Sequence, residues 1–110
     1  MIFDKDGNTT IVFQENISLT KFVENLNEAY DKIKNDHIVV NLFSFSKLSS
    51  NDILEFLNLA NVHKKANKSF VLVTTKVTYD EVPDNINVVP TLQEAKDIIE
   101  MEEIERDLEI

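Results

Sequence analysis

The side chains best suited to chemistry lie in one short segment, which runs from Ser49 through Ser50 and Asn51 to Asp52 and reaches Glu55 one turn later. On a helix, Asp52 and Glu55 would be neighbours, because residues three positions apart share a face. Two carboxylates can carry acid–base chemistry when a histidine or lysine converges on the same site. We find no such convergent group. We therefore interpret the pair as the solvated first turn of a helix and predict no catalytic residue and no enzyme activity.

Metal and thiol chemistry have little support in the sequence. The chain has no cysteine, which excludes disulfides, thiolate nucleophiles and cysteine-ligated zinc. Its two histidines, His37 and His63, stand apart and match no metal-binding spacing such as H-E-x-x-H. We predict packing or surface roles for both histidines, and neither a metal nor a cofactor.

The charge balance constrains the class of partner. Twenty acidic residues against 11 basic ones give a net charge of −9, which disfavours nucleic acid and anionic membranes because both present negative phosphates. The one local excess of base, Lys64, Lys65 and Lys68, falls near the end of a predicted helix, where cations stabilise the helix dipole. The segment before Asp52 also lacks the glycines of a nucleotide-binding loop. We expect another protein as the partner.

Two apolar runs predict the centre of the fold. The first, from Ile38 to Phe43, and the second, from Phe70 to Val73, are typical of strands covered on both faces of a parallel sheet. Between them apolar residues recur at the spacing of a crossover helix, namely Ile53, Phe56, Leu57 and Ala60. The pattern predicts a βαβ unit. Ser49 to Asp52 lie at its turn, where open α/β sheets place their sites.

Local signals predict four further elements: a hairpin around Gly7, a helix capped by Ser18, a short strand from Ile86 to Val89, and a helix that begins with a capping box of Thr91 and Glu94. Residues 1–110 then form a single α/β domain with a mixed sheet of four to five strands, an N-terminal hairpin, the βαβ unit and three main helices. The hydrophobic content of 43% argues against disorder. The N-terminus lacks the layout of a secretory signal, so we expect a cytoplasmic protein.

The segment from residue 100 to 110 is both acidic and amphipathic. It carries six acidic residues and one arginine, while Met101, Ile104 and Leu108 keep an approximate helical spacing. Two interpretations remain open. The three apolar residues either dock on a partner with a basic groove, or continue the C-terminal helix and pack on the domain's own sheet.

The predicted order of elements, together with VVNLFSFSKLSSNDILEFLNLA, resembles the STAS domain, named for sulphate transporters and anti-sigma factor antagonists. In that family a strand ending in Asp-Leu-Ser leads to an Asp-Ser-Ser-Gly turn that starts the central helix. The first serine of this turn is the phosphoacceptor. Aligned without gaps, the family's Asp-Leu falls on Asn41 and Leu42. Its turn falls on residues 49–52, so that the resemblance implies Ser50 as the phosphoacceptor.

The chain departs from the family pattern at two places. Of the four turn residues, only the phosphoacceptor serine is matched, at Ser50. The stretch from Thr74 to Pro90 is also several residues shorter than its family counterpart, which usually holds a third helix that helps form the partner-binding surface.

Physical chemistry leaves two interpretations of the turn open. A phosphate on Ser50 would gain from unpaired N–H groups at a helix start, but Asp52 and Glu55 would repel its roughly two negative charges. Alternatively, Ser49 or Ser50 is simply the N-cap of the helix, an interaction worth about 1 kcal/mol.

The resemblance implies a non-enzymatic regulatory module that binds another protein, either an anti-sigma or kinase-like regulator or an enzyme, through Ser49 to Asp52 and Glu55. One alternative is an accessory partner of an RNA-processing or other enzyme, without a phospho-switch. The ending MEEIERD is similar to that of small bacterial proteins labelled ribonuclease Z, although the chain lacks the H-x-H-x-D-H zinc motif of that family. A second alternative is a small-ligand-binding domain.

Overall fold

A β-hairpin opens the chain in the computed structural model, which describes residues 1–109. Strands β1 (Ile2–Asp6) and β2 (Thr9–Phe13) pair antiparallel, and two residues link them. Gly7, the first of these, has a φ of 62°, which glycine reaches without the steric cost that a Cβ would add. The hairpin predicted around Gly7 is confirmed.

The sheet has five strands in the order β1-β2-β3-β4-β5, and all pairs after the hairpin are parallel. Strands β3 (His37–Asn41) and β4 (Phe70–Val73) occupy the centre, and β5 (Asn87–Val89) forms the far edge. Val39 pairs with Val71 and Val40 with Leu72, which confirms the predicted parallel βαβ unit. The first apolar run extends beyond its strand, because β3 ends at Asn41 and Phe43 is exposed.

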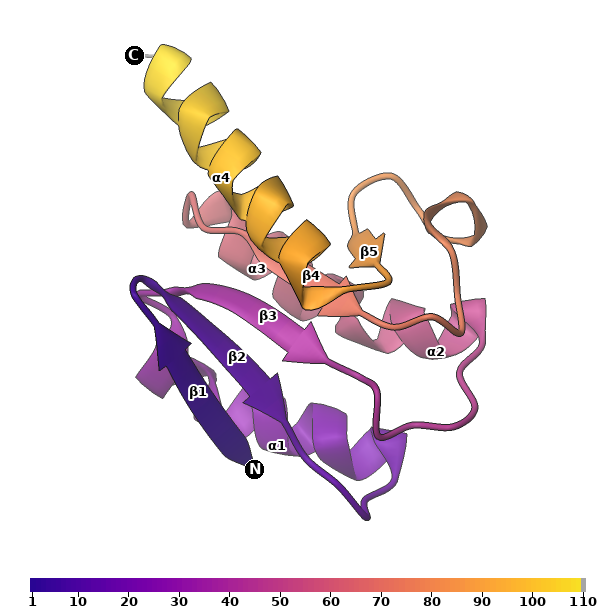
Figure 1. The fold of residues 1–110 in the computed structure, drawn as a ribbon. Helices are drawn as coiled ribbons and strands as arrows, with labels where there is room; N and C mark the ends of the chain where they lie inside the picture. Colours follow the sequence, from indigo (N-terminus) through magenta and orange to yellow (C-terminus); the bar gives the residue numbers. More distant parts are fainter. Residues whose placement is uncertain (110) are drawn as a thin grey trace.

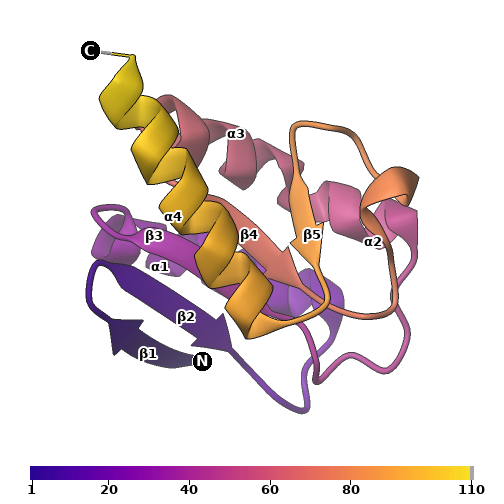
Figure 2. The ribbon, with the colours of Figure 1, turned by 45° about the horizontal axis from the view of Figure 1, so that its top comes forward.

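Helices cover the two faces of the sheet unequally, as Figures 1 and 2 show. One face carries α1 (Leu19–Ile33), which is capped by Ser18 as predicted, and the central helical segment; both pack into the larger core cluster. The other face carries α4 (Leu92–Leu108), whose Ala95 and Ile99 pack on Val39 and Val71. The predicted single α/β domain with three main helical segments is confirmed.

The central helix is not continuous. It consists of α2 (Ser50–Ile53), a 3₁₀ turn η1 (Leu54–Phe56) and α3 (Leu57–Lys65). A 3₁₀ turn winds more tightly than an α-helix, so it shifts the phase of every residue after it. Ile53, Phe56 and Ala60 of the predicted stripe are buried across this turn. Leu57 is half-buried and packs at the border of the core cluster, and Leu59, which the predicted stripe did not include, is also buried.

The difference in burial predicts different costs for two neighbouring substitutions. Leu59→Ala is expected to lower the free energy of unfolding by about 2 to 5 kcal/mol, because it empties space inside the core. Leu57→Ala is expected to cost about 1 kcal/mol, because part of its side chain already contacts water. Urea denaturation of both variants measures the difference. Equal losses, or a greater loss at Leu57, would mean that Leu57 contributes to the core as much as Leu59 does.

The stretch from β4 to α4, which includes the edge strand β5, contains little helix. It holds a 3₁₀ turn, η2 (Tyr79–Glu81), as the only helical element between Thr74 and Pro90. Thr91 then caps α4 by accepting the Glu94 N–H at 3.1 Å, but the Glu94 carboxylate accepts from the Thr91 hydroxyl rather than from its backbone. The predicted capping box is thus only half formed. Among residues 1–109, no helix is long and apolar enough to cross a membrane.

Candidate functional site

The β3–α2 turn is held by a reciprocal cap. Ser49 Oγ accepts the Asp52 N–H at 3.2 Å, and Asp52 Oδ2 accepts the Ser49 N–H at 2.9 Å. The N-cap is therefore Ser49 and not Ser50. The carboxylate of Asp52 is turned back toward the backbone of Ser49, so it does not form a free pair with the exposed Glu55.

Ser50 is the first residue of α2, and its hydroxyl takes no part in the cap. The residue is half-buried, and Asn51 beside it is exposed. Leu54 lies one turn further along the same face and exposes 41% of its surface, a high value for a leucine. Ser50 therefore lies one helical turn before an exposed apolar side chain.

The cap predicts unequal effects at the two serines. Ser49→Ala is expected to cost about 1 kcal/mol of stability, since it leaves the Asp52 N–H without its side-chain acceptor. Ser50→Ala is expected to change stability by less than about 0.5 kcal/mol. Thermal unfolding of both variants measures this. A larger loss for Ser50→Ala would indicate that Ser50, and not Ser49, is the N-cap of α2.

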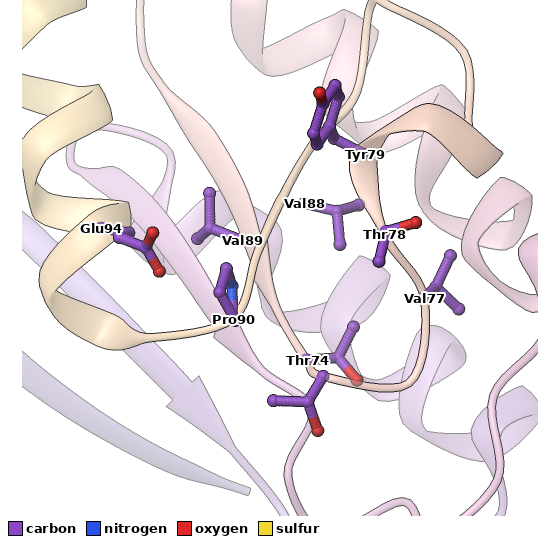
Figure 3. A pocket seen from close by; sticks show the side chains of 9 residues that line it. Thr74, Val77, Thr78, Tyr79, Val88, Val89, Pro90 and Glu94 are labelled. Carbon is purple, nitrogen blue, oxygen red and sulfur yellow. The ribbon is translucent and has the colours of Figure 1, made fainter.

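A pocket of about 340 Å³ opens at the carboxyl ends of β4 and β5, where the short connection returns to α4 (Figure 3). The buried valines Val77 and Val88 contribute apolar walls, Thr78 and the exposed Tyr79 stand at its border, and Glu94 reaches it from the first turn of α4. The full lining is Thr74, Thr75, Val77, Thr78, Tyr79, Val88, Val89, Pro90 and Glu94.

The pocket and the β3–α2 turn lie at the same edge of the sheet. Parallel strands end together, and Val77 packs in the core cluster that contains Ile53 of α2. The Asn85 side chain donates to Asn61 Oδ1 at 3.2 Å, which fixes the β4–β5 connection against α3. We call the residues Phe43, Ser49 to Asp52, Leu54, Tyr79 and the pocket lining the carboxyl-edge surface.

Three of its side chains are exposed apolar groups of large size. Phe43 follows β3, Leu54 lies in η1 and Tyr79 lies in η2, with 49%, 41% and 78% of their surfaces exposed. Sequence reasoning located the turn but missed Tyr79 and the pocket, because the segment after Thr75 reads as a polar loop. Three apolar or aromatic residues within that polar stretch, Val77, Tyr79 and Val82, are the signal that could have indicated them.

Both histidines are buried parts of the fold. The Asp36 carbonyl can only accept, so His63 Nε2 carries a proton and donates to it at 2.8 Å, while Nδ1 accepts the Tyr30 hydroxyl at 2.7 Å. His37 Nδ1 accepts the Ser69 N–H at 2.9 Å. Burial lowers the pKa of both imidazoles. Within residues 1–109 no group of three or more His, Asp or Glu side chains is arranged to hold a metal ion.

Comparison with known proteins gives a likeness of fold. No family model matches the chain, and no curated protein matches its sequence. The structure of the chain is similar to a solved structure, that of a variant of Moorella thermoacetica RsbS in which one serine is replaced by glutamate. The TM-score is 0.64 at 13% identity, over 90% of this chain and 93% of that one.

The chain has a STAS-like fold. The likeness extends over nearly the whole of both chains, so the predicted fold is confirmed along its length rather than at the central βαβ unit alone. At 13% identity the likeness concerns the fold and carries no residue roles. In this STAS-like domain, η2 occupies the connection for which the family resemblance implies a third helix.

Proposed function

We propose that this STAS-like domain is a non-enzymatic, cytoplasmic interaction module that binds one protein partner through its carboxyl-edge surface. The observation that carries the proposal is the exposure of Phe43, Leu54 and Tyr79 in the segments that follow β3 and β4, together with an apolar pocket that Tyr79 lines, on a domain with this fold. Exposed apolar groups gathered at one site are typical of protein interfaces, in which aromatic side chains that fill pockets supply most of the binding energy. A regulatory role of the anti-sigma factor antagonist type fits this arrangement.

Leu54 offers a sharp test of the surface. We expect Leu54→Glu to lower partner binding by about tenfold or more, because it places a charge inside an apolar contact. Val62→Glu is the matched control, since Val62 is a similarly exposed aliphatic residue, 46% exposed, on α3. Affinity purification from the native host, followed by quantitative mass spectrometry, compares the proteins captured by each variant.

A protein captured by the wild type and by Val62→Glu, but not by Leu54→Glu, supports the proposal and identifies the partner. If the three forms capture the same proteins in equal amounts, the carboxyl-edge surface is not the interface. A captured kinase-like or anti-sigma regulator favours the antagonist role. An RNA-processing enzyme would favour the accessory role instead.

We further propose that phosphorylation of Ser50 would switch this surface off. A phosphoryl group would add about two negative charges beside Asp52, Glu55 and the exposed Leu54, and an apolar contact there would then have to desolvate charge. Intact-mass measurement on protein from the native host would show an addition of about 80 Da. Ser50 that stays unmodified under several growth conditions, with full binding by Ser50→Ala, would leave an interaction module without a phospho-switch.

The pocket favours one further candidate, the binding of a small ligand. Its volume of about 340 Å³ falls at the lower end of the range usual for small-molecule sites, and its walls are mainly apolar. A ligand that binds only the folded state raises the melting temperature. Thermal unfolding with a panel of nucleotides and small apolar acids would detect it, and Val88→Phe, which fills the pocket, is the control that should abolish any shift.

A further inference from the structure

The end of α4 stands away from the sheet, as both ribbon views show (Figures 1 and 2). Its inner face is nevertheless anchored. Arg106 Nη2 donates to Ser69 Oγ at 2.8 Å, Ser69 Oγ donates to Glu102 Oε1 at 2.6 Å, and Glu103 Oε1 lies 3.3 Å from Nε2 of the buried His37. These contacts fix the rotation of the helix about its axis. They therefore decide which side chains face the solvent.

The side opposite these anchors is apolar. Met101, Ile104 and Leu108 expose 59%, 54% and 82% of their surfaces. Their spacing of three and then four residues is that of one seam of a two-helix interface, whose apolar positions recur at this period. We call these three residues the outer stripe. The interpretation that they pack on the domain's own sheet is wrong, because the helix presents Ala95 and Ile99 to the sheet instead.

Acidic side chains border the outer stripe on both sides. On a helix of 3.6 residues per turn, Glu100 and Asp107 lie along one border and Glu105 along the other, with Asp97 in line with the stripe. All four are exposed. Lys96 precedes the stripe on the same border as Glu100, but its ammonium group is paired with Asp6 at 2.9 Å. Along the outer stripe itself the flanks carry only negative charge, within a chain whose net charge is −9.

This charge pattern selects the occupant. If two copies met through their outer stripes, acidic flanks would face acidic flanks, and flanking residues of like charge oppose helix pairing. A helix with an apolar seam and flanking Lys or Arg would instead bury the stripe and pair every acidic border. We propose that the outer stripe of α4 docks a basic amphipathic helix of another protein.

The proposed site is separate from the carboxyl-edge surface. Helix α4 begins beside the pocket, to which Glu94 contributes, and runs away from it for 17 residues. At about 1.5 Å per residue the outer stripe starts roughly 10 Å further along the axis. The two surfaces share no residue, so either proposal can fail without the other.

Two synthetic helical peptides provide the test, with the same apolar heptad seam but with lysine flanks in one and glutamate flanks in the other. We expect the lysine peptide to bind the full chain and to shift backbone amide resonances of residues 97–108. Binding should weaken by about tenfold or more between roughly 0.05 M and 0.5 M salt. The glutamate peptide should not bind.

The decisive variant replaces Met101, Ile104 and Leu108 by serine and keeps every charge. Because these side chains are exposed, its melting temperature should match that of the wild type, while lysine-peptide affinity falls by about tenfold or more. Val62→Ser on α3 is the matched control and should bind normally. The double variant Glu100→Lys and Glu105→Lys should no longer bind the lysine peptide and should bind the glutamate peptide instead.

Several outcomes would overturn the proposal. Unchanged binding by the serine variant would show that the peptide responds only to net charge. Equal binding of both peptides, binding of neither, or shifts centred outside α4 would remove the outer stripe as a site for a basic helix. A wild-type dimer in light scattering that the serine variant abolishes would identify a second copy as the occupant.

Discussion

Replacing Phe56 by alanine is expected to lower the free energy of unfolding by about 3 to 5 kcal/mol. The side chain is 1% exposed, and its ring packs edge-on to that of Phe22 with centroids 6.2 Å apart. Phe22 also packs against Phe45, so the cavity would open where three aromatic rings join α1 to the central helix. A loss of this size is a large part of the stability of an ordinary domain.

Phe43→Ala is the control for this experiment. Phe43 is 49% exposed, so the same change of side chain should cost less than about 1 kcal/mol. Chemical denaturation gives both values, and unchanged dependence on denaturant would show that the unfolded states are comparable. Similar losses for the two variants would mean that Phe56 is not at the centre of the core.

Mild acid is expected to destabilise the protein below about pH 6.5. Burial lowers the pKa of both His37 and His63 in the folded state, so the unfolded chain takes up protons first. Stability is therefore complete above the unfolded pKa of about 6.5 and is lost as the pH falls toward the folded values. Each histidine that stays neutral in the folded state lowers the free energy of unfolding by at most about 1.4 kcal/mol per pH unit in this window.

The charged neighbours do not reverse this direction. Glu103 and Glu102 raise the pKa of His37, but burial outweighs them, and Arg106 and Lys68 act in the same direction as burial. For His63 the hydrogen bond to the Asp36 carbonyl raises the pKa, whereas burial lowers it. The charges of His37, Lys68 and Arg106 lower it further. Melting temperatures from pH 7.5 to 5.5 and the ring-proton resonances of the two histidines measure the effect. A flat stability profile, with both rings titrating at or above pH 6.5, would contradict it.

The strands, the hairpin and most helix starts were predictable from short-range signals. The valine-rich runs before Asn41 and after Ser69 indicate buried parallel strands, and Gly7 and Ser18 indicate a turn and a cap because the backbone there needs those residue types. The break in the central helix was not predictable. No glycine or proline marks it, and the predicted stripe included Leu57, which lies at the border of the core, but not the more deeply buried Leu59.

Only part of the candidate site, the β3–α2 turn, could be predicted from the sequence. The turn from Ser49 to Asp52 is local, and its capping pattern can be read directly. The pocket depends on how the segment after β4 lies against β5 and the start of α4, which is set by contacts between distant segments. The spacing of Met101, Ile104 and Leu108 likewise predicted a helix but not its rotation, which the Arg106–Ser69 contact determines.

The most direct test of the partner surface is hydrogen exchange of the backbone amides, compared between the free protein and the complex recovered by affinity purification. A bound partner is expected to slow exchange in residues 43–56 and 74–81, the segments that carry Phe43, Ser50, Leu54 and Tyr79. The Leu54→Glu variant should remain as unprotected there as the free protein. Protection confined to β1, to α1 or to any other segment outside the carboxyl-edge surface would contradict the account.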